Sequence, residues 1–485
     1  MRLTLLFIPL LLAFSVPVAG ESLSEQILVE HYSTVQGLPN NTVYSSQKDR
    51  DGFMWFGTWY GLCRFDGARF QTYNQKTKPG SDIPPRKIQT VAEDSNGNLW
   101  LKTADMKLYV FYRETEVFHS IYEEIKPFSV NLQVIKIQPT ADGNMLLLTK
   151  DKILLLAGTE KDGKIWLRML FDSRGKVNPY SFQLNYNVLS ETKDYLSWIA
   201  KDFNIISLAK GTALKSVPED YVSRYVASDR ELLCASSNGS KMYIGDDGGN
   251  IFVIDAEGGH IQKFCLQEQS AVRIIQSDRM GNIYAITDRG TVYECKNGSD
   301  QPKRLPFMLS SGMAKYMLCD MYDKLWIYEN GASLICYDPQ QRQHQRYPLK
   351  YKEDFIPELC MKENGEQGLF FLTPAGEALF FDRNSSTMHS ISEEAKHPED
   401  AKELHFSHIY MDRDGLVWLS STNNGIYRLN FPKQQFRLQP LPNNDFSGVR
   451  CIFQMKSGDI LVGSRSRDVY IYSPDGRLVV AENQT

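Results

Sequence analysis

The sequence lacks a marked excess of charge of either sign. Its 485 residues include 54 lysines and arginines against 58 aspartates and glutamates, which gives a formal net charge of −4 at pH 7. A polybasic nucleic-acid-binding chain would carry a strong positive excess, so we expect no nucleic-acid partner. With 42% hydrophobic and 23% charged residues the composition lies near the globular average, which excludes an intrinsically disordered chain.

Long hydrophobic runs are also scarce. The run at the N-terminus covers residues 3–14, follows Arg2 and is followed by small residues at 18–20. It is shorter than the roughly 20 residues that cross a bilayer, so it predicts a signal peptide at residues 1–20 rather than a membrane anchor. No later segment approaches a membrane span. We therefore expect an exported, periplasmic chain without a membrane span beyond the signal peptide.

Metal-binding patterns are missing as well. The eight cysteines contain no CxxC pair, and among the eight histidines only His405 and His408 lie close together. A three-residue offset on a strand places these two side chains on opposite faces. We therefore predict neither a metal site nor a cofactor. Most of the cysteines lie in apolar, strand-like runs, and we interpret them as buried free thiols.

The sequence is rich in aromatic residues, and it repeats. It holds 25 tyrosines, 25 phenylalanines and 7 tryptophans, which favour strands. Residues 49–67 read DRDGFMWFGTWYGLCRFDG, and residues 412–419 read DRDGLVWL. Weaker copies occur at 94–100 and 278–284. The copies are spaced by roughly 40–50 residues, which is the period of a four-stranded propeller blade.

Each repeat has the pattern of four short antiparallel strands. A polar turn at Asp51 and Gly52 is followed by a run, residues 53–58, that is apolar on both faces. Such a strand is expected where a neighbouring blade covers each side. With no helical periodicity between these strands, the sequence predicts an all-β fold built as tandem β-propellers with four-stranded blades.

The acidic pair in the turn superficially resembles a calcium loop. Asp49 and Asp51 have the spacing of the first two ligands of such a loop, but Phe53 and Tyr60 occupy the fifth and twelfth positions. Calcium loops need oxygen ligands there. We therefore predict a structural turn.

The same residues resemble a known family. Residues 37–43 read GLPNNTV and are followed directly by the repeat at 51–67. This combination resembles the two-component regulator propeller repeats in the periplasmic region of bacterial hybrid two-component sensor histidine kinases, and the likeness extends over residues 28–480. The resemblance implies an exported sensor region with two tandem, typically seven-bladed propellers that recognises breakdown products of complex glycans. In the family a membrane helix and a histidine kinase follow, and the full-length receptor is expected to form a homodimer.

The number of repeats predicts how the chain is divided. Seven repeat anchors fall between Gly52 and Asp323, and three fall between Gly368 and Gly458. We therefore predict a seven-bladed first propeller at 21–347 and an incomplete second propeller of about three blades at 348–485. The histidine kinase activity is expected only in a missing C-terminal part, so we expect this chain itself not to be an enzyme.

Candidate ligand-binding residues follow from which loops share one end of a blade. The connection into the innermost strand and the loop between the second and third strands lie at the same end, which groups Asn41 with Trp59 and Tyr60. An aromatic ring can stack on a pyranose, and planar polar groups can bind its hydroxyls or acidic substituents. We predict an oligosaccharide site from these residues, although Trp59 and Tyr60 could instead simply cover the blade junction. The equivalent loops elsewhere contribute Arg289, Asn423, Asn424, Arg465 and Arg467.

Two other functions stay open at the level of sequence. No GxSxG elbow, P-loop or HExxH motif is present. The paired carboxylates of a glycosidase could nevertheless come from distant blades. An exported propeller enzyme, either a glycosidase or a polysaccharide lyase, and a protein-interaction scaffold are therefore the alternatives to a glycan sensor.

Overall fold

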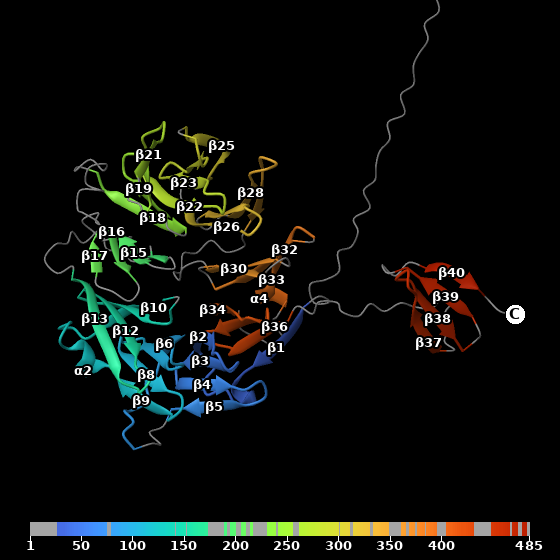
Figure 1. The fold of residues 1–485 in the computed structure, drawn as a ribbon, viewed down its shortest axis with the longest axis horizontal. Coiled ribbons are helices and arrows are strands. Elements are labelled where there is room, and N and C mark those ends of the chain that lie inside the picture. The colour runs from blue at the N-terminus through green and yellow to red at the C-terminus, as the bar shows by residue number, and fades with distance from the viewer. Residues whose placement is uncertain are drawn as a thin grey trace, which may run out of the picture. The chain divides into compact units, whose positions relative to one another are not determined.

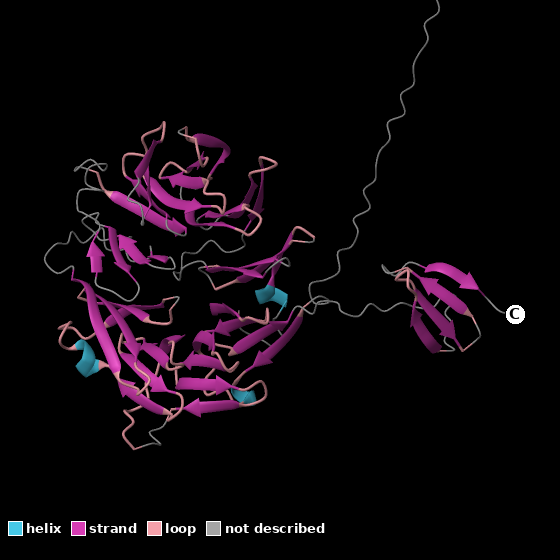
Figure 2. Cartoon of the chain, in the orientation of Figure 1, coloured by secondary structure: helices cyan, strands magenta, loops and turns pink. Residues whose placement is uncertain are grey.

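The structure is a computed structural model that describes residues 27–482 with internal gaps, the longest of which are 173–188, 217–229, 349–359 and 431–447 (Figure 1). Strands dominate it, as Figure 2 shows. The helical elements in the described residues are η1 (Thr34–Gln36), α2 (Tyr122–Ile125) and α4 (Ile391–Glu394). None of the helices in this part of the chain is long and apolar enough to cross a membrane. The predicted signal peptide lies outside the described residues.

The described strands form ten four-stranded sheets, and in nine of them the four strands follow one another in the chain. The first three of these nine consist of β2 (Val43–Lys48), β3 (Met54–Thr58), β4 (Gly61–Phe65) and β5 (Phe70–Tyr73); β6 (Ile88–Glu93), β7 (Leu99–Thr103), β8 (Leu108–Tyr112) and β9 (Val117–Ser120); and β10 (Val134–Pro139), β11 (Met145–Thr149), β12 (Ile153–Thr159) and β13 (Ile165–Asp172). The next three consist of β14 (Leu189–Glu191), β15 (Tyr195–Ile199), β16 (Ile205–Ala209) and β17 (Leu214–Ser216); β18 (Leu232–Asn238), β19 (Lys241–Asp246), β20 (Asn250–Asp255) and β21 (Ile261–Cys265); and β22 (Val272–Ser277), β23 (Ile283–Thr287), β24 (Thr291–Cys295) and β25 (Lys303–Met308). The last three consist of β26 (Ala314–Cys319), β27 (Leu325–Glu329), β28 (Ser333–Asp338) and β29 (Gln343–Pro348); β30 (Cys360–Asn364), β31 (Gly368–Leu372), β32 (Ala378–Asp382) and β33 (Thr387–Ser390); and β37 (Val449–Gln454), β38 (Ile460–Ser464), β39 (Val469–Tyr472) and β40 (Leu478–Glu482).

The tenth sheet joins the two ends of a long stretch of chain. Its order is β1-β36-β35-β34, with β1 (Leu28–Tyr32), β34 (Phe406–Met411), β35 (Val417–Ser421) and β36 (Ile426–Asn430). β1 pairs antiparallel with β36, so that Leu28 lies opposite Asn430 and Tyr32 opposite Ile426. The first strand of the described chain therefore completes a sheet whose other three strands come from residues 406–430.

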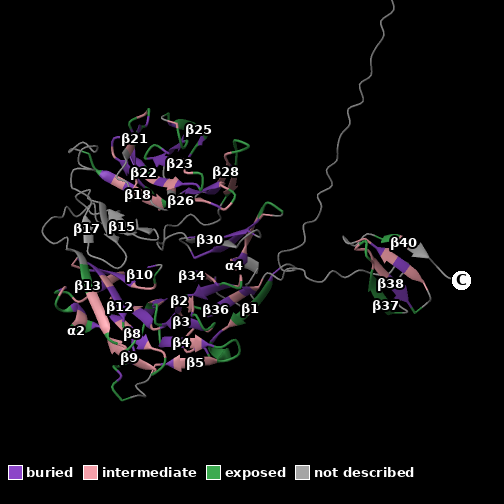
Figure 3. Cartoon of the chain, in the orientation of Figure 1, coloured by how far each residue is buried: buried purple, intermediate pink, exposed green. Residues whose placement is uncertain are grey.

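The second strand of most sheets is buried along its whole length (Figure 3). In β3 the side chains alternate between two neighbours, as the two-residue period of a strand requires. Trp55 packs against Phe111 of the sheet β6–β9, with ring centroids 5.6 Å apart, while Phe56 faces Trp418 of the tenth sheet at 5.8 Å. The predicted all-β architecture of four-stranded blades is confirmed, and burial of both strand faces explains the continuous apolar runs.

The division of the chain differs from the one that the repeats predict. The structure separates residues up to Asn430 from those that begin at Phe431, whereas the sequence predicts a boundary after residue 347. The first unit holds nine of the described four-stranded sheets, so seven blades are not confirmed. The physical reason is continued packing beyond residue 347, because Trp326 of β27 contacts Phe371 of β31 at 5.3 Å between ring centroids. The second unit contains the sheet β37–β40.

The cysteines with described side chains are all free thiols. Cys63, Cys234 and Cys295 are buried, as predicted, and burial raises the pKa of each of these thiols to about 12. Cys265 and Cys451 are exposed, so the prediction of burial is wrong for them.

Candidate ligand-binding site

The repeated acidic turn binds its own backbone and a tryptophan. Asp49 follows β2, and its Oδ1 accepts hydrogen bonds from the backbone N–H groups of Asp51 at 3.0 Å and Phe53 at 2.9 Å. Its Oδ2 accepts a hydrogen bond from Nε1 of Trp55 at 2.7 Å. Gly52 takes the positive φ of 93° that this turn requires. The predicted structural turn is confirmed. The same tryptophan-to-aspartate bond links Trp100 to Asp94, Trp326 to Asp320 and Trp418 to Asp412.

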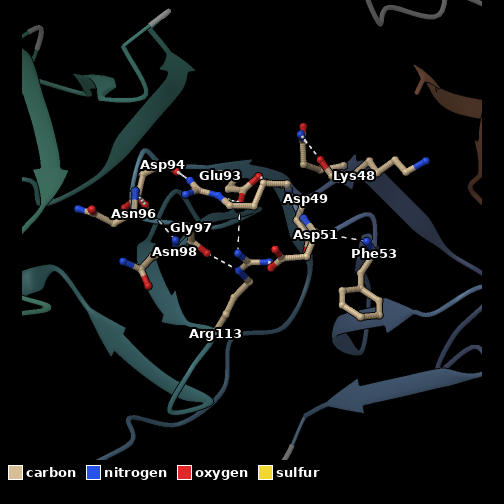
Figure 4. A network of polar contacts seen from close by, with 12 residues as sticks. Lys48, Asp49, Asp51, Phe53, Glu93, Asp94, Asn96, Gly97, Asn98 and Arg113 are labelled. Carbon is tan, nitrogen blue, oxygen red and sulfur yellow. Dashed lines mark hydrogen bonds and ion pairs between the residues drawn. The ribbon is translucent and has the colours of Figure 1, made fainter. Parts of the chain in front are cut away.

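A cation from an adjacent sheet joins several of these turns. Figure 4 shows Arg113, which follows β8, directed at Asp49 and Asp51 of the sheet β2–β5. In the same way Lys48 lies 3.1 Å from Asp412. These ion pairs hold neighbouring sheets together. No motif in the sequence indicated the partner cations, because they come from other sheets, although Arg113 and Arg383 lie 64 and 63 residues after the aspartates that they contact.

A cavity of about 1120 Å³ opens beside Arg113. Its lining is mixed in charge and includes groups that already pair with one another. Arg64 lies over the ring of Phe53 at 4.7 Å, and His119 Nε2 lies 2.7 Å from a carboxylate oxygen of Glu124. Within the described residues no group of three potential metal ligands occurs.

The opposite end of the sheet β2–β5 presents Trp59 and Tyr60 to solvent. Both lie in the turn between β3 and β4, and their exposed fractions are 43% and 44%. The turn is rigidly held, because Thr58 Oγ1 donates to the carbonyl of Gly61 at 2.8 Å and accepts the N–H of Tyr60 at 3.1 Å. The Trp59 N–H also donates to the carbonyl of Thr42 at 3.1 Å. The two rings are therefore exposed on a fixed backbone.

Two cations lie over these rings. Nζ of Lys87 is 4.0 Å from the centre of the Trp59 ring, and Cζ of Arg86 is 5.4 Å from that of Tyr60. Both distances are within the range of cation–π attraction. Arg86 and Lys87 immediately precede β6 of the next sheet and are exposed. The sequence prediction missed these two cations. They lie in the connection into the innermost strand of the following blade, and such connections lie at the same end as the turn that carries Trp59 and Tyr60.

Asn41, Asn423 and Asn424 lie at the same end, where the sheet β2–β5 meets the tenth sheet. The Gly425 N–H donates to the carbonyl of Asn41 at 2.8 Å, and Thr42 Oγ1 donates to the carbonyl of Thr422 at 2.9 Å. Each asparagine side chain makes a hydrogen bond to a nearby residue. Asn41 Oδ1 accepts the N–H of Thr34, and Asn423 Oδ1 accepts a bond from Ser421 Oγ. Asn424 Nδ2 donates to the Tyr427 hydroxyl.

The structure thus brings five of the eight candidate residues to one place. We call Asn41, Trp59, Tyr60, Asn423 and Asn424, together with Arg86 and Lys87, the ledge. Arg289 is exposed in a different sheet, β22–β25. Arg465 is exposed in the second unit, and Arg467 lies outside the described residues.

Comparison with known families gives one match. Residues 37–60 match the model of the two-component regulator propeller. This match confirms the family resemblance expected from the sequence. The propeller repeat contains the acidic turn at one end of its sheet and Asn41, Trp59 and Tyr60 at the other.

Several solved structures are similar in fold. The extracellular domain of the hybrid two-component system BT3049 from B. thetaiotaomicron is 17% identical, with 94% of this chain and 67% of that chain covered and a TM-score of 0.31. For the extracellular domain of the one-component system BT4673 from the same organism the values are 14%, 94%, 73% and 0.32. For a virginiamycin B lyase from Staphylococcus aureus with quinupristin they are 14%, 61%, 94% and 0.40. A comparison with curated proteins finds no significant match. Identities and TM-scores this low do not indicate what the present chain binds.

Proposed function

We propose that this chain is the ligand-binding propeller region of an exported two-component sensor, and that it binds an oligosaccharide breakdown product at the ledge. The observation that carries the proposal is the pair of exposed rings, Trp59 and Tyr60, on a hydrogen-bonded turn inside the propeller repeat. Large aromatic surfaces are costly to expose and commonly mark binding sites. Here they lie beside amide side chains, which suits a pyranose ring with hydroxyl groups.

The rigidity of the ledge supports recognition. Trp59 is held through its N–H by Thr42, and Thr42 is itself bonded to the tenth sheet through Thr422. A ligand that touches both sheets would stabilise the arrangement of them that it binds more tightly. The size of this shift is set by the difference in its affinity for the two arrangements. In a periplasmic receptor, which we expect to be a homodimer, this bias would reach a histidine kinase outside this chain.

A titration that follows tryptophan fluorescence tests the proposal. Trp55, Trp100, Trp326 and Trp418 are buried, whereas Trp59 is 43% exposed, so a ligand on the ledge should change the emission of Trp59. We expect a saturating change with an oligosaccharide from a panel of glycan digests, and its loss in Tyr60→Ala, which keeps the Trp59 reporter. Tyr122→Ala is the matched control, since Tyr122 is 49% exposed on α2, outside the ledge.

Two outcomes would contradict the proposal. The first is that no oligosaccharide of the panel binds. The second is that the purified chain shortens the bound glycan and releases reducing ends, which would favour the propeller enzyme. A stable protein partner that copurifies and covers Trp59 would instead favour the scaffold.

A further inference from the structure

The backbone of Lys87 is anchored directly to the turn that carries the two exposed rings. The Lys87 N–H donates to the carbonyl of Trp59 at 3.0 Å, and the carbonyl of Lys87 accepts the N–H of Ala104 at 2.9 Å. Lys87 therefore bridges the Trp59 turn and the turn between β7 and β8. Its φ is 51°, a left-handed conformation that side-chain-bearing residues seldom adopt. Two hydrogen bonds thus hold the backbone from which the Lys87 side chain extends.

These two cations differ from others between the sheets, because no carboxylate in the described part of the chain lies within ion-pair distance of them. Lys48, Arg113 and Arg346 each have an acidic partner. The acid in the turn to which Lys87 is bonded, Asp105, is paired with Lys107 at 2.9 Å. The ledge therefore presents two positive charges that the described chain does not neutralise.

Cation–π attraction holds the charged groups of Arg86 and Lys87 over the two rings, and both residues stay exposed to water. Exposed pairs of this kind are weak. A carboxylate or sulfate group can therefore displace water from the guanidinium of Arg86 and the ammonium of Lys87. Arginine offers a planar pair of donors to such an anion, and lysine adds a compact charge.

We propose that the ligand of the ledge is an anionic saccharide whose acidic groups bind Arg86 and Lys87 while its rings contact Trp59 and Tyr60. This inference rests on the proposed function and specifies the substrate class of the same site. The shared chemistry is an anion carried on a sugar ring. It can be the carboxylate of a uronic acid or a sulfate ester, and the probes below separate these sources.

Calorimetric titration of the full chain with two matched probe pairs tests the inference. The first pair is trigalacturonic acid and its methyl ester, which share the same sugar rings but differ in the charge of the carboxyl groups. The second is a sulfated carrageenan tetrasaccharide and its desulfated form. We expect the charged member of at least one pair to bind about fivefold to tenfold more tightly than its neutral counterpart, as two exposed ion pairs allow. This preference should shrink as salt rises from about 50 to 300 mM, because screening weakens exposed charge pairs.

Charge-removing variants identify the residues responsible. In Arg86→Gln combined with Lys87→Gln, the preference should vanish, so that the charged and the neutral member of each pair bind with equal affinity. Lys161→Gln removes one positive charge from an exposed residue in the turn between β12 and β13 and should leave the preference intact. Trp59→Ala should weaken both members.

Different outcomes would overturn the preference for an anionic saccharide and the saccharide site itself. Equal binding of charged and neutral members, or a preference that survives in the double glutamine variant, overturns the inference while the proposed saccharide site stands. Absence of binding by every probe and by the whole glycan panel overturns both.

Discussion

Arg113, which follows β8, forms an ion pair with the carboxylate of Asp49 in the neighbouring sheet. The Asp49 side chain is fully buried, and Arg113 also lies 2.9 Å from Asp51. The pair links two sheets at the end opposite the ledge.

Removal of this arginine should destabilise the first unit. In Arg113→Met the Asp49 carboxylate stays buried without its cation, so we expect the free energy of unfolding to fall by about 3 kcal/mol. Urea denaturation followed by tryptophan fluorescence measures the change. Lys126→Met is the control, because Lys126 and Glu123 form an exposed pair and should contribute under about 0.5 kcal/mol. Equal effects of the two substitutions would show that Arg113 is not a structural link.

The ion pair between Lys48 and the turn of the tenth sheet predicts a pH dependence. Burial alone lowers the pKa of Lys48, but hydrogen bonds to Asp414 and Asp412 outweigh it and raise the pKa above its ordinary value of 10.5. The same contact lowers the pKa of Asp414 below 3.8. The contribution of Lys48 is therefore present below pH 10.5 and lost as the pH rises through the folded-state pKa, and that of Asp414 is present above pH 3.8 and lost as the pH falls through its folded-state pKa.

We expect the stability difference between the wild type and Lys48→Met to be largest near neutral pH and to shrink at both extremes. Urea midpoints across the pH range measure it. A difference that is constant from acid to alkali would mean that only the packing of the lysine stem matters.

The pairing of β1 with β36 predicts a specific cross-link. Glu30 lies opposite Arg428, and the two side chains form an ion pair. Directly opposed strand residues are close enough for a disulfide. Glu30→Cys with Arg428→Cys should therefore form an intrachain disulfide on mild oxidation, which peptide mapping without reductant detects, while each single variant serves as control. No cross-link would be expected if β1 closed a propeller that ends near residue 347.

Thiol reactivity should separate the cysteines by burial. Cys63 is buried and its pKa is raised to about 12, so it holds almost no reactive thiolate at pH 8. Cys265 and Cys451 are exposed. We expect iodoacetamide at pH 8 to label Cys265 and Cys451 in the native chain, and Cys63 only after denaturation. Mass spectrometry of the peptides measures this, and rapid native labelling of Cys63 would contradict the packing of β4.

The local blade structure is predictable from sequence because its causes are local. Asp49 and Gly52 determine the acidic turn, and the apolar run that contains Trp55 determines a strand buried on both faces. The pairing of β1 with β36 joins segments far apart in the sequence. The number of repeats does not predict it, because any sheet with an open edge could accept β1. The ledge was found through Trp59 and Tyr60, which lie in the repeat. Arg86 and Lys87 lie between repeats and were recognised only when the neighbouring sheet was in place.

Hydrogen exchange of the full chain, with and without the saccharide that binds best, tests the location of the ligand most directly. The ledge predicts slower exchange on binding in the turn at 58–61, in the segment at 86–88 and in the turn at 422–425, because ligand contact suppresses local opening. Protection confined to the acidic turns and the cavity beside Arg113, with none at Trp59 and Tyr60, would contradict the account.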